Sequence, residues 1–203
     1  MRRAVVAVLH GGFWRDRYAL DLMEPLCADL AARGYEAWNI EYRRLGSGGG
    51  WPATFDDARA AIANAGLPLV TIGHSAGGHL ALWLGAEAGA ALAVSQAGVV
   101  DLEEAWRLEL SSHAAAELMG ATPVDAPERF AAASPAARLP LGIRQVLVHG
   151  RGDDTVPVAM SRAYVTRARA AGDDVELIET DEGHFECLEP TSASWAAILE
   201  RLP

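Results

Sequence analysis

Short apolar runs alternate with longer stretches of helical spacing along most of this chain. Runs that are mostly continuous in apolar residues are typical of strands buried on both faces of a parallel sheet. These runs lie at residues 4–9, 36–40, 69–72, 92–97, 145–148 and 175–178. Apolar positions that recur every three or four residues predict helices at 21–33, 55–65, 76–88, 159–171 and 194–202. The alternation predicts an α/β fold, in which helices cover both faces of a mostly parallel sheet of about six strands.

One long interruption, at residues 101–141, breaks the alternation. Helical patterns at 103–110 and 114–119 are followed there by four prolines. Long irregular segments of compact domains usually have a function, so we expect this insert to be a small lid or a pocket wall. The whole chain, 1–203, is expected to form a single domain, because 203 residues that are 51% hydrophobic can bury one core and are too few for two ordinary domains.

Composition narrows the partners and the compartment. The formal net charge of -10 argues against binding to nucleic acid or to an anionic membrane, which needs clustered Lys and Arg. We find no secretory signal and no transmembrane span in the sequence. The distant Cys27 and Cys187 fit a reduced, cytoplasmic protein better than a disulfide scaffold. We therefore expect a small-molecule substrate as the partner, with a homodimer as a candidate assembly.

A Gly-x-Ser-x-Gly segment joins the third apolar run to the helix that follows it. Such a turn holds a serine in a strained backbone, which glycines at Gly73 and Gly77 make sterically tolerable. In an open parallel sheet, ligand sites form beyond the carboxyl ends of the strands, and Ser75 stands at such an end. Ser75 is therefore the predicted nucleophile.

A serine hydroxyl needs a base to take its proton, and an imidazole with a pKa near ~6.5 suits that role. His184 follows the last apolar run, so its place in the chain makes it the predicted base. A carboxylate must then orient the imidazole, and the acids that follow the fifth run are Asp153 and Asp154. Asp101, just after the fourth run, is an alternative acid.

The oxyanion that develops during acyl transfer needs backbone donors. We expect these donors to be the amide of Ala76, which follows the nucleophile, and those of Gly12 and Phe13 in the glycine-rich turn after the first run. Aromatic residues at strand ends favour a pocket for a small acyl or aryl group. The candidates for this pocket are Trp14, Phe185, Trp51 and Trp106.

Four motifs resemble the α/β-hydrolase superfamily, most closely its kynurenine formamidase-like and acetyl-esterase-like branches. They are HGGFW from residue 10, GHSAGGHLA from residue 73, HGRGDDTVP from residue 149 and GHF from residue 183. The resemblance implies a three-layer α/β-hydrolase sandwich, with the catalytic acid at the fifth position of HGxxDxxVP, which is Asp153. The segment at 134–139 is also similar to esterases and to peptidases of the prolyl oligopeptidase type. Since the superfamily usually has two further strands before HGG, the resemblance implies a fold shortened at the N-terminus.

These observations predict a serine hydrolase that cleaves small carboxylic esters or aryl formamides through an acyl-enzyme. We expect it to need no cofactor and no metal, because the spacing of His74 and His79 does not suit a metal pair on one helix face. Two alternatives stay open. One is a noncatalytic ligand-binding homologue on the same fold, and the other is a small peptidase.

Overall fold

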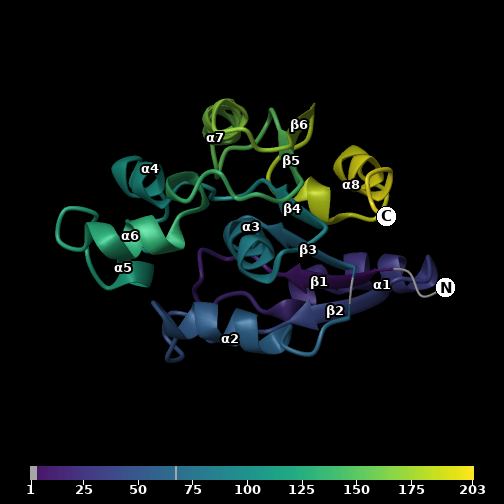
Figure 1. Cartoon of the computed structure of the whole chain (residues 1–203), viewed down its shortest axis with the longest axis horizontal. Coiled ribbons are helices and arrows are strands. Elements are labelled where there is room, and N and C mark those ends of the chain that lie inside the picture. The colour runs from purple at the N-terminus through teal and green to yellow at the C-terminus, as the bar shows by residue number, and fades with distance from the viewer. Residues whose placement is uncertain (1–3, 67) are drawn as a thin grey trace.

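The computed structural model of the protein describes residues 4–66 and 68–203. Six strands form one sheet in the order β2-β1-β3-β4-β5-β6, and every neighbouring pair is parallel (Figure 1). The strands are β1 (Val5–Leu9), β2 (Glu36–Ile40), β3 (Leu69–His74), β4 (Leu92–Gln96), β5 (Gln145–Gly150) and β6 (Val175–Thr180). Every predicted strand is confirmed. Because all six strands are parallel, the loops that follow them meet at one edge of the sheet.

Helices cover both faces of this sheet (Figure 1). One face carries α1 (Glu24–Ala32) and α8 (Ala193–Leu199), and the other carries α2 (Ala53–Ala61), α3 (Ala76–Ala88) and α7 (Val158–Ala170). Alternate residues of β1 enter opposite cores: Val6 and Val8 pack with the first set of helices, whereas Ala7 and Leu9 pack with the second. The three-layer α/β-hydrolase architecture is thus confirmed.

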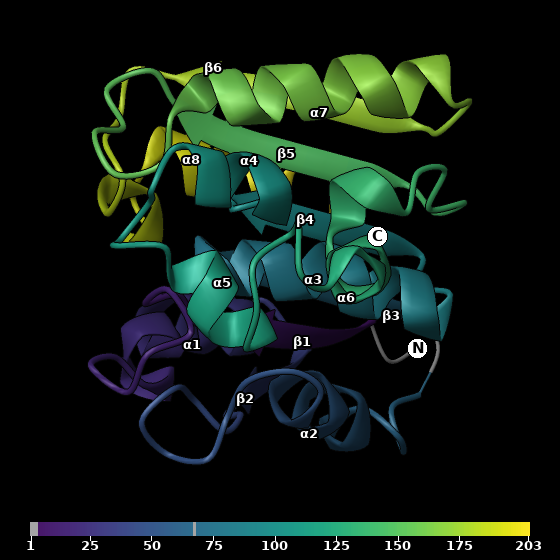
Figure 2. The same cartoon turned by 90° about the vertical axis from the view of Figure 1, so that its left-hand side faces the viewer.

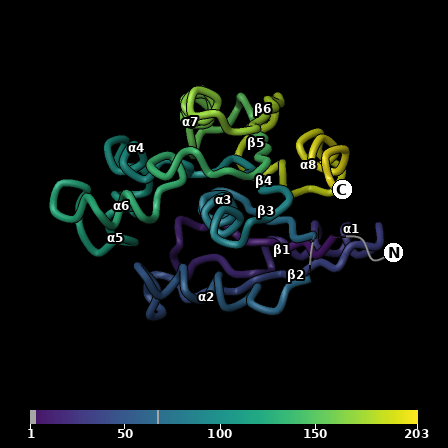
Figure 3. Tube along the Cα trace, in the orientation of Figure 1, coloured from purple at the N-terminus to yellow at the C-terminus, as the bar shows by residue number. Residues whose placement is uncertain are grey.

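The central helix, α3, packs across β1, β3 and β4 (Figure 3). Its bounds are those that the apolar spacing predicts, and it ends at Gly89, whose left-handed φ of 62° closes the last turn. None of the helices in the described part of the chain is long and apolar enough to cross a membrane.

The insert lies outside α3 and contains three short helices (Figure 2). They are α4 (Leu102–Arg107), α5 (Ala114–Met119) and α6 (Pro127–Ala133). Leu118, Met119 and Phe130 pack into the same core as α3. The sequence pattern does not predict α6, because prolines there suggest a break. Pro127 instead occupies the start of the helix, where a missing N–H costs no hydrogen bond.

The described residues also form three short 3-10 helices. They are η1 (Leu20–Met23), η2 (Pro135–Ala137) and η3 (Glu186–Leu188). The first continues directly into α1, so the helix expected at residues 21–33 is a 3-10 turn followed by an α-helix.

Candidate active site

Ser75 lies in the tight turn between β3 and α3. Its φ of 55° and ψ of -117° are strained for a residue with a side chain. The turn is tight because backbones touch: a Cβ on Gly73 would lie 2.0 Å from the carbonyl oxygen of Gly77, and one on Gly77 would lie 2.2 Å from that of Leu9. The two glycines therefore allow the turn that the sequence motif predicts.

The hydroxyl of Ser75 makes no hydrogen bond within the described structure. The backbone N–H of Ser75 donates to the carbonyl of Gln96 at 2.8 Å, which fixes the residue to β4. Its Oγ is buried and has no hydrogen-bond partner in the described structure, yet Ser75 and His184 line the same cavity. A buried hydroxyl without a partner is costly, which is typical of a group reserved for a ligand.

The imidazole of His184 is hydrogen-bonded to a carboxylate. Its Nδ1 lies 2.7 Å from Oδ2 of Asp153, and both side chains are almost fully buried. An imidazole whose Nδ1–H is held by a carboxylate keeps Nε2 free to accept a proton.

Four donors surround the carboxylate of Asp153. Oδ1 accepts from the backbone amides of Thr155 and Val156, both at 2.8 Å, and Oδ2 lies 3.2 Å from Nε2 of His149 as well as beside His184. Burial raises the pKa of Asp153, but the hydrogen bonds from His149 and His184 outweigh it and hold this pKa well below its usual range. Asp153 is therefore ionised and able to stabilise an imidazolium.

The other two candidate acids lie elsewhere. Asp154 is exposed and accepts a hydrogen bond from the Thr155 hydroxyl. Asp101 accepts from the amides at the start of α4 and pairs with Arg167 at 2.8 Å, so it caps a helix of the insert. Among the described residues, His184 makes its hydrogen bond and ion pair to Asp153 and to neither of these carboxylates.

The loop that carries His184 is attached to β3 and to β4. His74 donates from Nε2 to the carbonyl of His184 at 2.8 Å, and the thiol of Cys187 donates to the same oxygen at 3.3 Å. Gln96 donates to the carbonyl of Cys187 at 2.9 Å. His74 and Cys187 therefore have structural roles, because these contacts hold the loop of His184 against the strands beside Ser75.

The three predicted oxyanion donors come from the turn after β1 and from the start of α3. Among the described residues, the amides of Gly12 and Phe13 donate no hydrogen bond, and Ala76 is the first residue of α3, where amides lack an intrahelical acceptor. Gly12 and Phe13 have positive φ values of 108° and 50°. The Tyr42 hydroxyl donates to the carbonyl of His10 at 2.7 Å and so anchors the start of this turn.

A cavity of about 290 Å³ lies beside Ser75. It is lined by Gly12, Phe13, Arg15, Arg17, Tyr18, Leu22, His74, Ser75, Ser111, Thr155, His184 and Phe185. Of the four predicted pocket residues, only Phe185 is part of this lining. Ser111 is the contribution of the insert, while Arg15, Arg17 and Tyr18 come from the loop after β1 and carry no sequence motif that predicts them.

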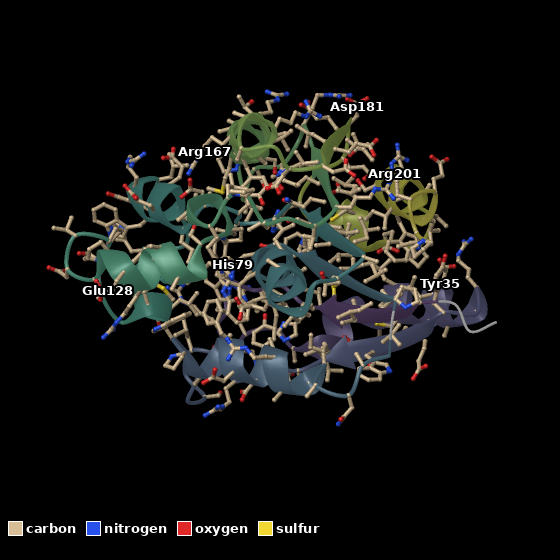
Figure 4. All side chains as sticks on the ribbon, viewed as in Figure 1. Tyr35, His79, Glu128, Arg167, Asp181 and Arg201 are labelled. Atoms are coloured by element: carbon tan, nitrogen blue, oxygen red, sulfur yellow. The ribbon has the colours of Figure 1, made fainter. Side chains whose placement is uncertain are left out.

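Trp14, Trp51 and Trp106 lie outside this cavity, which corrects the prediction. Trp14 is fully buried, and its indole N–H donates to Nδ1 of His79 at 3.2 Å. His79 in turn donates to the carbonyl of Ala133 at 2.9 Å. Figure 4 shows His79 in the interior, between α3 and the insert. Trp51 packs edge-to-face on Phe55, and the Trp106 ring lies beside His113 in the insert.

The described residues contain no group of three His, Cys, Asp or Glu side chains that could hold a metal ion. The nitrogens of His74 and His79 that make hydrogen bonds face backbone carbonyls and an indole rather than each other. Their arrangement therefore serves packing and hydrogen bonding.

Buried neutral imidazoles make the stability of this fold depend on pH. Burial, and then the charge of His184, lowers the pKa of His74 to about 3, and burial lowers that of His79 to about 4. Histidines of an unfolded chain have a pKa near ~6.5. Below that pH, His74 and His79 therefore bind protons in the unfolded chain but stay neutral in the folded one. We expect the free energy of unfolding to fall between pH 6.5 and 4, by up to about 1.4 kcal/mol per pH unit for each of the two imidazoles.

Urea unfolding at pH 7, 6 and 5 measures this effect. The His113→Gln variant is the control, since it removes a partly exposed imidazole of the insert and keeps both buried ones. A free energy of unfolding that stays constant from pH 7 to 5 would contradict the prediction.

Comparison with protein families gives two matches. The model of the prolyl oligopeptidase family matches residues 65–198, and a second family model, BD-FAE, matches residues 2–93. No curated protein sequence matches the chain.

Solved structures with the same fold include several proteins described as esterases. A bifunctional GH43-CE protein of Bacteroides eggerthii has a TM-score of 0.83 at 20% identity, over 99% of this chain and 34% of its own. A truncated carbohydrate esterase from gut microbiota has a TM-score of 0.82 at 20% identity, over 98% and 84%. An acetyl ester-xyloside bifunctional hydrolase of Caldicellulosiruptor lactoaceticus has a TM-score of 0.78 at 21% identity, over 99% and 83%. The chain thus spans about a third of the first protein, and at such identities the likeness is one of fold.

Proposed function

Because the chain belongs to the prolyl oligopeptidase family of α/β-hydrolases, we propose that it is a serine hydrolase that cleaves small carboxylic esters through an acyl-enzyme. One observation carries the proposal: the bonded pair of Asp153 and His184 shares a cavity with a strained serine whose hydroxyl has no internal partner. Nucleophile, base and orienting acid are the three parts that acyl transfer to serine requires.

In this mechanism the Oγ of Ser75 attacks the ester carbonyl while Nε2 of His184 takes the hydroxyl proton. The ionised Asp153 stabilises the imidazolium that forms. The backbone amides of Gly12, Phe13 and Ala76 bind the oxyanion. The imidazolium then protonates the departing alcohol, and His184 next activates a water that hydrolyses the acyl-enzyme and releases the acid.

Esters are favoured over peptides by the size of the site. A cavity of about 290 Å³ lies at the lower end of ligand sites and suits a short acyl group better than a polypeptide. The solved structures of similar fold that are described as carbohydrate esterase and acetyl ester-xyloside hydrolase support the same substrate class. Aryl formamides are a second candidate class, favoured by the rings of Phe13 and Phe185 in the lining. Rates on N-formylkynurenine and on short p-nitrophenyl esters, measured side by side, distinguish the two classes.

A fluorophosphonate probe tests whether the serine is activated. We expect wild type to be labelled and Ser75→Ala to remain unlabelled, because the probe reacts with a serine whose proton a base removes. Ser111→Ala is the matched control, since Ser111 also lines this cavity and its hydroxyl accepts a hydrogen bond from Arg15 instead of facing a base. It should keep the label. An unlabelled wild type would instead favour a noncatalytic ligand-binding protein.

A further inference from the structure

The cavity over Ser75 is basic, although the chain as a whole is strongly acidic. Its lining contains Arg15 and Arg17 and no aspartate or glutamate, whereas the formal net charge of the chain is -10. The side chains that line this cavity therefore differ in the sign of their charge from the chain as a whole.

The two arginines differ in how far their charge is already used. Arg15 donates from Nε and Nη2 to the carboxylate of Glu117, at 2.9 and 2.7 Å, and from Nη1 to the hydroxyl of Ser111 at 3.0 Å. Its charge is neutralised, and its role is to attach the loop after β1 to the insert. Arg17 is exposed and pairs with no carboxylate in the part of the chain that the structure describes; its guanidinium lies over the ring of Tyr18.

Tyr18 holds the guanidinium of Arg17 at the mouth of the cavity. The guanidinium carbon lies 5.4 Å from the centre of the Tyr18 ring, a distance typical of a cation–π contact. The ring itself packs on the backbone of Gly12, where a Cβ would approach to 2.8 Å, and its centre lies 6.5 Å from that of Phe185. Arg17 thus lines the same cavity as Gly12 and Phe13, and its N–H groups make no hydrogen bond within the described residues.

We propose that the substrates of this site are small esters that carry a carboxylate, and that Arg17 is the residue that selects them. The inference rests on the proposed ester hydrolysis and adds the charge of the substrate. A planar guanidinium with free donors matches the two oxygens of a carboxylate. Arg17 and Ser75 line one cavity of about 290 Å³, so one short molecule can reach both.

A second depression fixes the direction in which the charged end points. It shares His184 and Phe185 with the catalytic cavity, and its lining includes the carboxylates of Asp154, Glu186 and Glu189. An anionic group is repelled on that side. The carboxylate of the substrate is therefore expected to lie on the Tyr18 side of the cavity, against Arg17.

Two matched pairs of esters test the proposal on both halves of the substrate. Mono-p-nitrophenyl glutarate against p-nitrophenyl valerate places the charge on the acyl group, and 4-acetoxybenzoate against its methyl ester places it on the alcohol. The quantity to compare is the ratio of kcat/KM for the anionic ester over its neutral partner, after subtraction of spontaneous hydrolysis. Intrinsic reactivity cancels when this ratio is compared between variants.

In at least one pair, we expect Arg17→Ala to lower the ratio about fivefold, as befits an ion pair at a solvent-exposed position. Arg17→Lys should keep part of the preference, because the charge remains without the fork, and Arg17→Glu should lower the ratio further. Added salt should reduce the wild-type ratio, since exposed charges are screened. Arg107→Ala, which removes another exposed arginine, in α4 and outside this cavity, should leave the ratio unchanged.

Equal ratios for wild type and Arg17→Ala in both pairs would overturn the inference while leaving the proposed function intact, provided that the neutral esters are hydrolysed. If no ester of either kind is hydrolysed, the proposed function fails and this inference fails with it.

Discussion

Replacing Ser75 with alanine is expected to lower kcat for p-nitrophenyl acetate by about a million-fold, the size of effect known for the nucleophile of subtilisin. The reason is chemical: the other parts of the site remain, but no group is left to form the acyl-enzyme. The residual rate should then come from the oxyanion donors and from binding alone. Steady-state kinetics with the purified variant measure the loss.

The fold should survive this substitution, because the Oγ of Ser75 makes no hydrogen bond within the described structure. A melting temperature equal to or above that of wild type would show that the loss of activity is not a loss of folding. If Ser75→Ala instead keeps most of the turnover, the nucleophile has been misassigned.

If the proposed triad operates, replacing Asp153 with asparagine is expected to lower kcat about 10⁴-fold, the loss known for the same change in a Ser-His-Asp protease. The backbone amides of Thr155 and Val156 both point at Oδ1, so the oxygen of the new amide must face them. The amide nitrogen then faces Nδ1 of His184 and donates to it. That contact forces the proton onto Nε2, where the imidazole can no longer accept one from the serine.

Asp154→Asn is the matched control for this prediction. The two carboxylates are neighbours in sequence, but Asp154 is exposed and, within the described residues, accepts a hydrogen bond only from the hydroxyl of Thr155. We expect its kcat to stay near that of wild type. Similar losses in the two variants would mean that charge near the base matters more than the orientation of His184.

Local sequence signals predict the sheet and the central helix well, because each is encoded by neighbouring residues. A continuous apolar run predicts a buried strand, and Gly73, Gly77 and Gly89 mark the two ends of α3. The alignment of His184 with Asp153 also follows from order along the chain, since parallel strands bring their carboxyl ends to one edge. These features need no knowledge of distant contacts.

The lining of the cavity could not be predicted in the same way. Phe13 and Trp14 are adjacent and both have positive φ, yet Phe13 lines the cavity while Trp14 is buried against His79. That partner lies 65 residues away in the sequence. Arg17 likewise gains its place from the packing of Tyr18 on Gly12, which no periodicity or motif encodes.

The contact of Gly77 with the end of β1 has a consequence for how this site can change over evolutionary time. A Cβ on Gly77 would meet the carbonyl oxygens of Leu9 and His10, so main chain packs directly on main chain where the turn of Ser75 approaches the loop after β1. The gap between those two loops is therefore independent of the size of any side chain. Substitutions of apolar residues in the interior can therefore change the stability of the protein without changing the distance between these two loops.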